Sequence, residues 1–135
     1  MTFVDTSFLG ALFIPNDAWH VAALAWSRRV KPPLLTTDYI LLEFADGFAR
    51  VDWRPTADRV IHSMQANPSI RIVPQSRSLF DRGLELYRSR SDKSWSLTDC
   101  LSFVVMKDEG CSQALSADHH FEQAGFRALL RTDPP

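Results

Sequence analysis

The sequence predicts a single α/β domain, residues 1–135, in which helices cover both faces of a central, mostly parallel sheet. Short apolar, β-prone runs alternate with longer segments of helical periodicity along all 135 residues. Such alternation favours right-handed crossovers between parallel strands and a three-layer α/β/α architecture. Hydrophobic residues make up 45% of the chain, which is enough for one core, and no internal repeat or linker divides it.

The first residues set the pattern of strand, turn and helix. Residues 2–4 form a short apolar strand that ends at Asp5, and residues 8–14 form an apolar run rich in helix formers. Ser7 is expected to cap that helix. Ligands of open parallel sheets bind beyond the carboxyl ends of strands, near the point where the strand order reverses. Asp5 is therefore a candidate site residue, although Asp is also common at caps and turns.

The same alternation continues to the end of the chain. Strands are predicted over residues 34–37, 70–73, 114–116 and 126–130. Helices are predicted over residues 17–30, 39–51, 55–67 and 77–88, from Ser96 or Thr98 to Gly110, and briefly after Asp118. Asp38 and Ser76 are expected to cap two of these helices.

Composition excludes several classes of protein. The formal net charge is −1, so the overall balance gives no general affinity for polyanions. No apolar run approaches the roughly 20 residues of a membrane span, and the start lacks the basic segment of a signal peptide. Cys100 and Cys111 are expected to be free thiols in a reducing cytoplasm. The sequence therefore predicts a cytoplasmic protein without a membrane partner.

Four carboxylates fall where strands end and helices begin. Asp5 and Asp118 follow predicted strands, and Glu43 and Asp99 lie near the starts of helices. In a parallel sheet these positions gather at one edge, so the four side chains can converge. Like charges in one cleft are unfavourable unless a cation neutralises them. Oxygen ligands without Cys or His at metal-ligand spacing suit Mg²⁺ or Mn²⁺ rather than zinc. A capping or solvated role is the alternative for each carboxylate.

The ordered motifs resemble those of the PIN-domain family, and within it the VapC-type toxin ribonucleases of toxin–antitoxin pairs. The matching stretches are V-D-T-S-F-L at 4–9, L-L-E-F-A at 41–45, L-T-D-C-L-S at 97–102 and L-S-A-D-H-H-F at 115–121, with Gly125 after them. The resemblance covers essentially the whole chain. It implies a PIN-like fold and an acidic site made of Asp5, Glu43, Asp99 and Asp118.

The function implied by this resemblance is Mg²⁺-dependent hydrolysis of RNA phosphodiester bonds, with Mn²⁺ as a possible substitute. In such a mechanism bound cations activate a water molecule and neutralise charge on the attacked phosphate. Asp5 and Asp99 are expected to bind the metal directly. Glu43 is expected to orient water or a ligand, and Asp118 to complete or bridge the site.

Other side chains are expected to support this chemistry. The hydroxyls of Ser7 and Thr98 stand beside acidic positions and are expected to hold the carboxylates by hydrogen bonds. The first candidates for RNA phosphate contacts are Arg88, Arg90 and Lys93, with a solvated loop as the alternative. His119 and His120 are expected to have surface or structural roles.

The resemblance also implies partners: an RNA substrate, a cognate antitoxin and, commonly, a second copy of the chain. Four large side chains are interpreted as core or as the lining of a groove for a partner helix: Trp19, Trp26, Phe48 and Trp53. Two other functions stay open. An acidic-site phosphatase is disfavoured because the Asp5 turn reads D-T-S rather than D-x-D. A catalytically silent PIN-like domain that binds RNA or a partner is disfavoured because all four acids are present.

Overall fold

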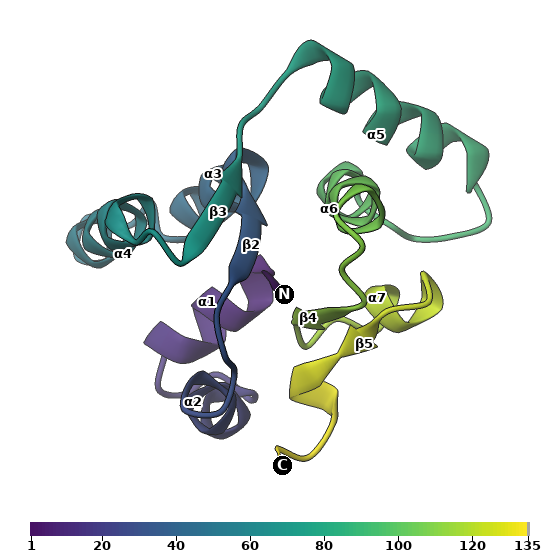
Figure 1. Cartoon of the computed structure of the whole chain (residues 1–135). Coiled ribbons are helices and arrows are strands. Elements are labelled where there is room, and N and C mark those ends of the chain that lie inside the picture. The colour runs from purple at the N-terminus through teal and green to yellow at the C-terminus, as the bar shows by residue number, and fades with distance from the viewer. Residues whose placement is uncertain (135) are drawn as a thin grey trace.

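The computed structural model describes residues 1–134 and confirms the three-layer α/β/α architecture (Figure 1). One sheet has the strand order β3-β2-β1-β4-β5, and every pairing described is parallel. Its strands are β1 (Thr2–Val4), β2 (Leu34–Thr37), β3 (Ile70–Val73), β4 (Gln113–Leu115) and β5 (Arg127–Ala128).

Helices cover both faces of this sheet. In Figure 1, α1, α2 and α4 lie on one side of the sheet and α5, α6 and α7 on the other. The helices are α1 (Thr6–Phe13), α2 (His20–Ser27), α3 (Asp38–Gly47), α4 (Arg54–Ala66), α5 (Arg77–Ser89), α6 (Leu97–Asp108) and α7 (His119–Gln123), followed by a short 3₁₀ helix, η1 (Leu129–Arg131).

The strand order reverses beside β1. The chain builds outward from β1 through β2 to β3 and then returns to add β4 on the other side of β1. Val4 pairs with Leu115 in this ladder, and the backbone N–H of Asp5 donates to the Leu115 carbonyl at 3.1 Å. The residues that follow β1 and β4 are therefore neighbours at the switch point, where open α/β sheets bind their ligands.

Local capping chemistry agrees with several predicted boundaries. The Ser76 hydroxyl accepts from the N–H of Leu79 and starts α5. Ser96 starts α6 through a capping box with Asp99. After α6, Gly110 has a φ of 66°, the left-handed conformation that ends helices and favours glycine.

Two expected caps are wrong by one or two positions. The N-cap of α1 is Asp5, and Ser7 lies inside the helix, because the Asp5 backbone is still extended at the end of β1. Thr37 rather than Asp38 caps α3, accepting from the N–H of Ile40 at 3.2 Å. The Asp38 carboxylate instead accepts from the backbone N–H of Gln75 at 2.9 Å.

Three elements are shorter than predicted. The helix expected over residues 39–51 ends at Gly47, where the chain leaves the helix at the C-cap Phe48. The helix expected over residues 17–30 begins at His20, because the Asp17 carboxylate accepts from the Trp19 N–H and forms a turn. The last strand covers only two residues before η1, since its sole described neighbour is the three-residue β4.

An aromatic cluster joins α6 to α7. The Phe103 ring lies 5.0 Å from each of the Trp95 and Phe121 rings, edge to face, and 5.7 Å from Phe126. The Trp95 indole N–H donates to the side-chain oxygen of Gln123 at 3.0 Å. These contacts fix the relative position of two helices that each begin beside the carboxyl edge of the sheet.

The cysteine prediction is confirmed, because Cys100 and Cys111 are both free and buried. Within residues 1–134, no helix is long and apolar enough to cross a membrane.

The packing of α5 on α6 leaves no room for a side chain at Gly83. A Cβ there would lie 2.5 Å from Cδ2 and 2.7 Å from Cγ of Leu101, which is buried. We expect Gly83→Ala to lower the free energy of unfolding by about 1–2 kcal/mol, since overpacking outweighs the gain in helix propensity. Urea unfolding would measure this. Gly10→Ala is the matched control, because nothing lies within 4 Å of its Cβ and it should stabilise α1.

Candidate acidic active site

A buried carboxylate occupies the centre of the carboxyl edge. Asp5 directly follows β1 and is only 6% exposed. Its Oδ2 atom accepts two hydrogen bonds, from Ser7 Oγ at 2.7 Å and from Ser116 Oγ at 2.8 Å. Among the described residues no hydrogen bond reaches Oδ1, so this oxygen is available to a ligand.

The two serines also tie Asp5 to the turn after β4. Ser7 Oγ accepts from the backbone N–H of Ala117 at 3.0 Å, and Ser116 Oγ accepts from that of Asp118 at 3.0 Å. The expected support from Ser7 is therefore present. Ser116 was missed in the sequence analysis, although its position between a strand and Asp118 mirrors the hydroxyl residues beside Asp5.

Asp99 is held by the N-terminus of α6. Its Oδ2 accepts from the Ser96 backbone N–H at 3.1 Å, while its own N–H donates to Ser96 Oγ at 3.0 Å. The side chain is 13% exposed. Thr98 lacks the expected role, because its hydroxyl makes no hydrogen bond to a carboxylate within residues 1–134. The capping box fixes Asp99 instead.

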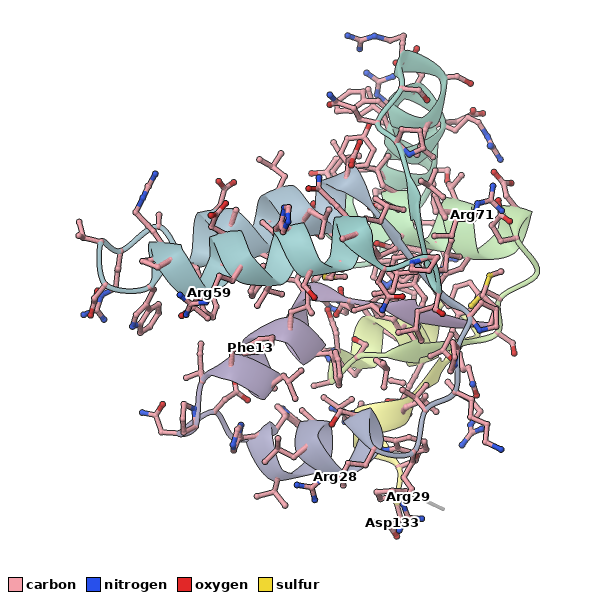
Figure 2. All side chains as sticks on the ribbon, turned by 60° about the vertical axis from the view of Figure 1, so that its left-hand side comes forward. Phe13, Arg28, Arg29, Arg59, Arg71 and Asp133 are labelled. Atoms are coloured by element: carbon pink, nitrogen blue, oxygen red, sulfur yellow. The ribbon has the colours of Figure 1, made fainter. Side chains whose placement is uncertain are left out.

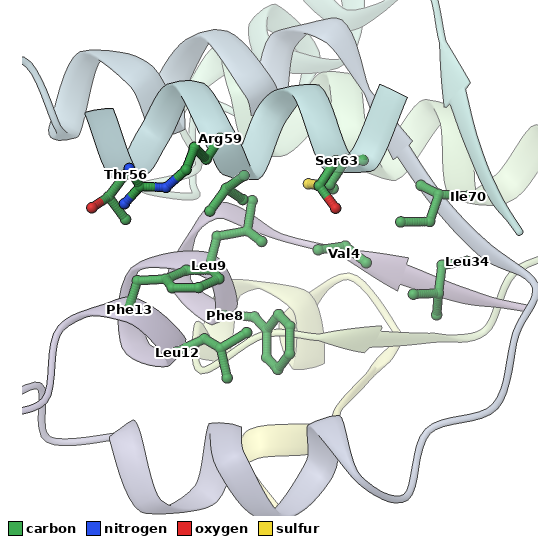
Figure 3. Close-up of a pocket in the computed structure, with 12 residues that line it drawn as sticks. Val4, Phe8, Leu9, Leu12, Phe13, Leu34, Thr56, Arg59, Ser63 and Ile70 are labelled. Atoms are coloured by element: carbon green, nitrogen blue, oxygen red, sulfur yellow. The ribbon is translucent and has the colours of Figure 1, made fainter. Parts of the chain in front are cut away.

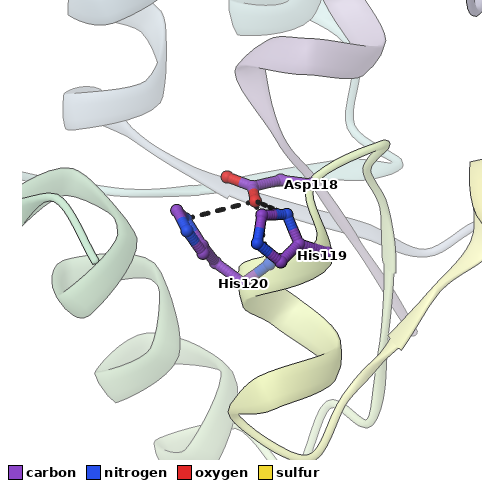
Figure 4. Close-up of side chains that lie close together, drawn as sticks. All are labelled: Asp118, His119 and His120. Atoms are coloured by element: carbon purple, nitrogen blue, oxygen red, sulfur yellow. Dashed lines mark hydrogen bonds and ion pairs between the residues drawn. The ribbon is translucent and has the colours of Figure 1, made fainter. Parts of the chain in front are cut away.

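Asp118 and His120 lie together at the start of α7 (Figure 4), and His120 also reaches Asp99. Asp118 Oδ1 accepts from the His120 backbone N–H at 2.8 Å, so the carboxylate caps this short helix. His120 Nδ1 lies 3.2 Å from Asp99 Oδ2 and 3.2 Å from Asp118 Oδ1. His120 thus lies inside the acidic cluster, although a surface or structural role was expected from the sequence. His119 is 58% exposed and approaches only Asp118, at 3.7 Å.

Glu43 completes the group from the middle of α3. It is half-buried, and its carboxylate has no hydrogen bond or ion pair with the other described residues. Its negative charge nevertheless acts on Asp5, as the charge of Asp99 does. The structure therefore brings all four predicted carboxylates to one edge of the sheet.

The electrostatics of this cluster disfavour its charged form. Burial raises the pKa of Asp5 from 3.8 to about 6; the Ser7 and Ser116 hydrogen bonds oppose this rise, and the charges of Asp99 and Glu43 add to it. Burial also raises the pKa of Asp99, with a contribution from Asp118. In the part of the chain that the structure describes, no Lys or Arg pairs with any of the four carboxylates. Their oxygen atoms and excess negative charge fit a divalent cation.

The predicted RNA-contact residues lie in the segment that leads into α6. Arg88 is exposed on the last turn of α5. Arg90 donates to both carboxylate oxygens of Asp92, at 3.0 and 3.2 Å, and its guanidinium lies 5.0 Å from the Trp95 ring. Lys93 is half-buried in the loop. The structure does not bring these three side chains to the carboxylates, and their contact with RNA stays a prediction.

Comparison with known proteins identifies the family. The sequence model of the PIN domain matches residues 2–127. The chain belongs to the PIN-domain family. The expected membership is therefore confirmed over almost the whole chain.

Within this family the chain is similar to VapC-type toxins. VapC20 of Mycobacterium tuberculosis, from strains CDC 1551 / Oshkosh and H37Rv, is named a 23S rRNA-specific endonuclease. It is 29% identical over 135 residues, which cover 93% of this chain and 95% of VapC20. The crystal structure of M. tuberculosis VapC20, described as a sarcin–ricin loop cleaving toxin, has a TM-score of 0.87 at 26% identity and covers 95% of this chain and 98% of that one.

A more distant PIN-like fold is also similar. The crystal structure of FitAcB from Neisseria gonorrhoeae has a TM-score of 0.66 at 14% identity, and the match covers 94% of this chain and 95% of that chain. At this identity the likeness extends to the fold alone.

We expect Asp5→Asn to stabilise the metal-free protein at neutral pH. Because the pKa of Asp5 is higher in the folded protein than in the unfolded chain, the free energy of unfolding is greatest below pH 3.8 and falls as the pH rises through about 6. The asparagine should therefore gain about 2–3 kcal/mol at pH 7.5 and almost nothing at pH 3.8. Urea unfolding in EDTA across this range would measure the difference. Asp46→Asn, a substitution on the exposed surface of α3, is the matched control.

Proposed function

We propose that this PIN-domain chain is a metal-dependent endoribonuclease, the toxin component of a toxin–antitoxin pair. The observation that carries the proposal is the cluster of Asp5, Glu43, Asp99 and Asp118 at the switch point, without Lys or Arg counter-charges among residues 1–134. The similarity to VapC20, which is named an endonuclease specific for 23S rRNA, supports RNA as the substrate.

The carboxylates supply the ligands for a cation. Asp5 and Asp99 would hold Mg²⁺, or Mn²⁺ in its place, with Asp118 completing the site. When bound, such a cation lowers the pKa of a water molecule and offsets negative charge on the attacked phosphate.

The chain's own residues keep these groups in position. Ser7 and Ser116 fix the Asp5 carboxylate through Oδ2 and leave Oδ1 available to a ligand. The capping box with Ser96 restrains Asp99 in the same way. Glu43 makes no hydrogen bond to the described side chains, so its carboxylate can accept one from the attacking water and orient it.

The substrate would approach along the loop that precedes α6. Arg90 and Lys93 lie in this loop and Arg88 on the turn of α5 before it, and together they would supply positive charge for RNA phosphates. Arg90 is already paired with Asp92, so phosphate would compete with that exposed carboxylate. Arg88 makes no ion pair with the described residues, and we expect it to contribute more.

Replacing Asp99 with asparagine tests the nuclease. The amide oxygen can still accept from the Ser96 N–H, so the helix cap should survive while the negative charge is lost. We expect cleavage of 23S rRNA in Mg²⁺ to fall by at least about 100-fold, the scale of a lost metal ligand. Gel analysis of the RNA in Mg²⁺, Mn²⁺ and EDTA would measure it.

Asp81→Asn is the matched control, because Asp81 lies on the exposed face of α5 beside Arg77. It should cleave like the wild type. Undiminished cleavage by a folded Asp99→Asn variant would contradict the site. Absence of metal-dependent cleavage by the wild type would favour the silent binding domain, and hydrolysis of p-nitrophenyl phosphate alone would favour the phosphatase.

An apolar groove between α1 and α4 is our candidate for antitoxin docking (Figures 2 and 3). Its volume is about 480 Å³. Phe8, Leu9, Leu12 and Phe13 of α1 line one wall, and Phe13 is 40% exposed. None of the four large side chains expected from the sequence lines this groove. Trp26 and Phe48 are buried in the core, and Trp19 and Trp53 pack partly against it.

The charge at the rim of the groove indicates the kind of segment that fits. Arg59 of α4 lies at the groove beside Phe13 and has no ion-pair partner within the described part of the chain. A helix with an apolar face and a nearby carboxylate would satisfy both features. We propose the antitoxin as its source.

The same proposal includes two further expectations, a cytoplasmic location and a homodimer. Sedimentation equilibrium of the purified protein would test the homodimer.

Phe13→Glu should weaken antitoxin binding by about tenfold or more, because a charge replaces a side chain that the partner would bury. Titration calorimetry with the co-expressed, purified antitoxin would measure the change. Val21→Glu is the control, since Val21 is 80% exposed on α2 and does not line the groove. Equal binding by both variants would contradict the docking site.

A further inference from the structure

An imidazole lies among the carboxylates, and the acidic site described above does not require it. His120 Nδ1 is 3.2 Å from a carboxylate oxygen of Asp99 and 3.2 Å from one of Asp118. The ring is 19% exposed, so the surrounding elements restrict its position. Separately, its backbone N–H donates to Asp118 Oδ1 at 2.8 Å, the hydrogen bond by which Asp118 caps α7.

The spacing of these atoms matches that of ligands around one ion. Asp118, His119 and His120 each offer a ligand atom, and these atoms lie within 4.8 Å of one another. Asp99 is not part of this group but approaches it through the 3.2 Å contact of its Oδ2 atom with His120 Nδ1. Ligands that each stand about 2.1 Å from a shared cation are separated by about 3–4 Å. The 3.2 Å separations of His120 Nδ1 from both carboxylates fall in this range.

We propose that His120 is a nitrogen ligand of the cation held by Asp99 and Asp118, and that it makes the site select Mn²⁺ over Mg²⁺. The inference rests on the proposed metal-dependent function. Mg²⁺ takes oxygen ligands and dehydrates reluctantly, whereas first-row transition ions also bind imidazole. A mixed set of carboxylates and one imidazole therefore gives Mn²⁺ an advantage that carboxylates alone do not.

The two adjacent histidines differ in their access to the cluster. His119 is 58% exposed and its Nδ1 atom is 3.7 Å from Asp118, with no contact to Asp99 among the described residues. Only His120 lies between the two helix starts that carry these carboxylates. The inference assigns the ligand role to His120 alone.

His120→Ala tests the side chain alone, because Asp118 caps α7 by accepting from the backbone N–H of residue 120, which alanine keeps, and because alanine suits a helix. His119→Ala is the matched control. Titration of each purified protein with Mn²⁺, followed by the electron paramagnetic resonance signal of free Mn²⁺, gives the affinity. Competition by Mg²⁺ gives the selectivity.

We expect His120→Ala to lose Mn²⁺ affinity by about tenfold or more and to keep Mg²⁺ affinity within about twofold. His119→Ala should retain both affinities. Pulsed electron paramagnetic resonance should detect imidazole nitrogen coupled to bound Mn²⁺ in the wild type and in His119→Ala but not in His120→Ala.

Three outcomes would overturn the inference while leaving the nuclease proposal intact. Nitrogen coupling that persists in His120→Ala would assign the ligand elsewhere. An equal loss for both ions would make His120 a positioning residue. Tighter Mn²⁺ binding by His120→Ala would mean that the imidazole only offsets the carboxylate charges. Absence of Mn²⁺ and Mg²⁺ binding by the wild type would instead contradict the proposed metal-dependent function itself.

Discussion

The burial of a carboxylate at the end of the central strand is the constraint on which this structure depends. Asp5 is almost fully enclosed, and its charged form is disfavoured by burial and by two other acids. Two serine hydroxyls on one oxygen offset part of this cost. Those serines come from α1 and from the residue after β4, so the arrangement requires β1 and β4 to be adjacent. The reversal of strand order supplies that adjacency.

The other acids reach the same edge through helix capping. Asp99 forms a capping box in the first turn of α6, and Asp118 caps α7. A capping role and a metal-binding role are therefore compatible for these two residues, since each helix start directs a carboxylate toward the sheet edge. The aromatic contacts of Phe103 then fix the two helices relative to each other. The geometry of the site follows from ordinary secondary-structure chemistry.

Much of this arrangement was predictable from local sequence. The strands at residues 34–37 and 70–73 match their predicted bounds, because turn residues and prolines flank strong apolar runs. The parallel topology predicts that Asp5, Asp99 and Asp118, at strand ends and helix starts, gather at one edge, whereas Glu43 reaches it from the middle of α3. The positions of His120 and Ser116 were not predictable in this way, because they depend on contacts between segments about 20 and 110 residues apart. The same holds for the groove, whose walls come from α1 and α4.

The energetic cost of Asp5 has an evolutionary consequence. Most substitutions in a protein core reduce stability, which slows the loss of an activity that resides there. At Asp5 we expect the opposite sign, since burial disfavours the charged carboxylate and its removal should favour folding of the metal-free protein at neutral pH. A lineage harmed by the enzyme could therefore silence it by one substitution and keep a folded domain that still displays the groove. Inactive descendants with intact partner surfaces are the expected product of such a history.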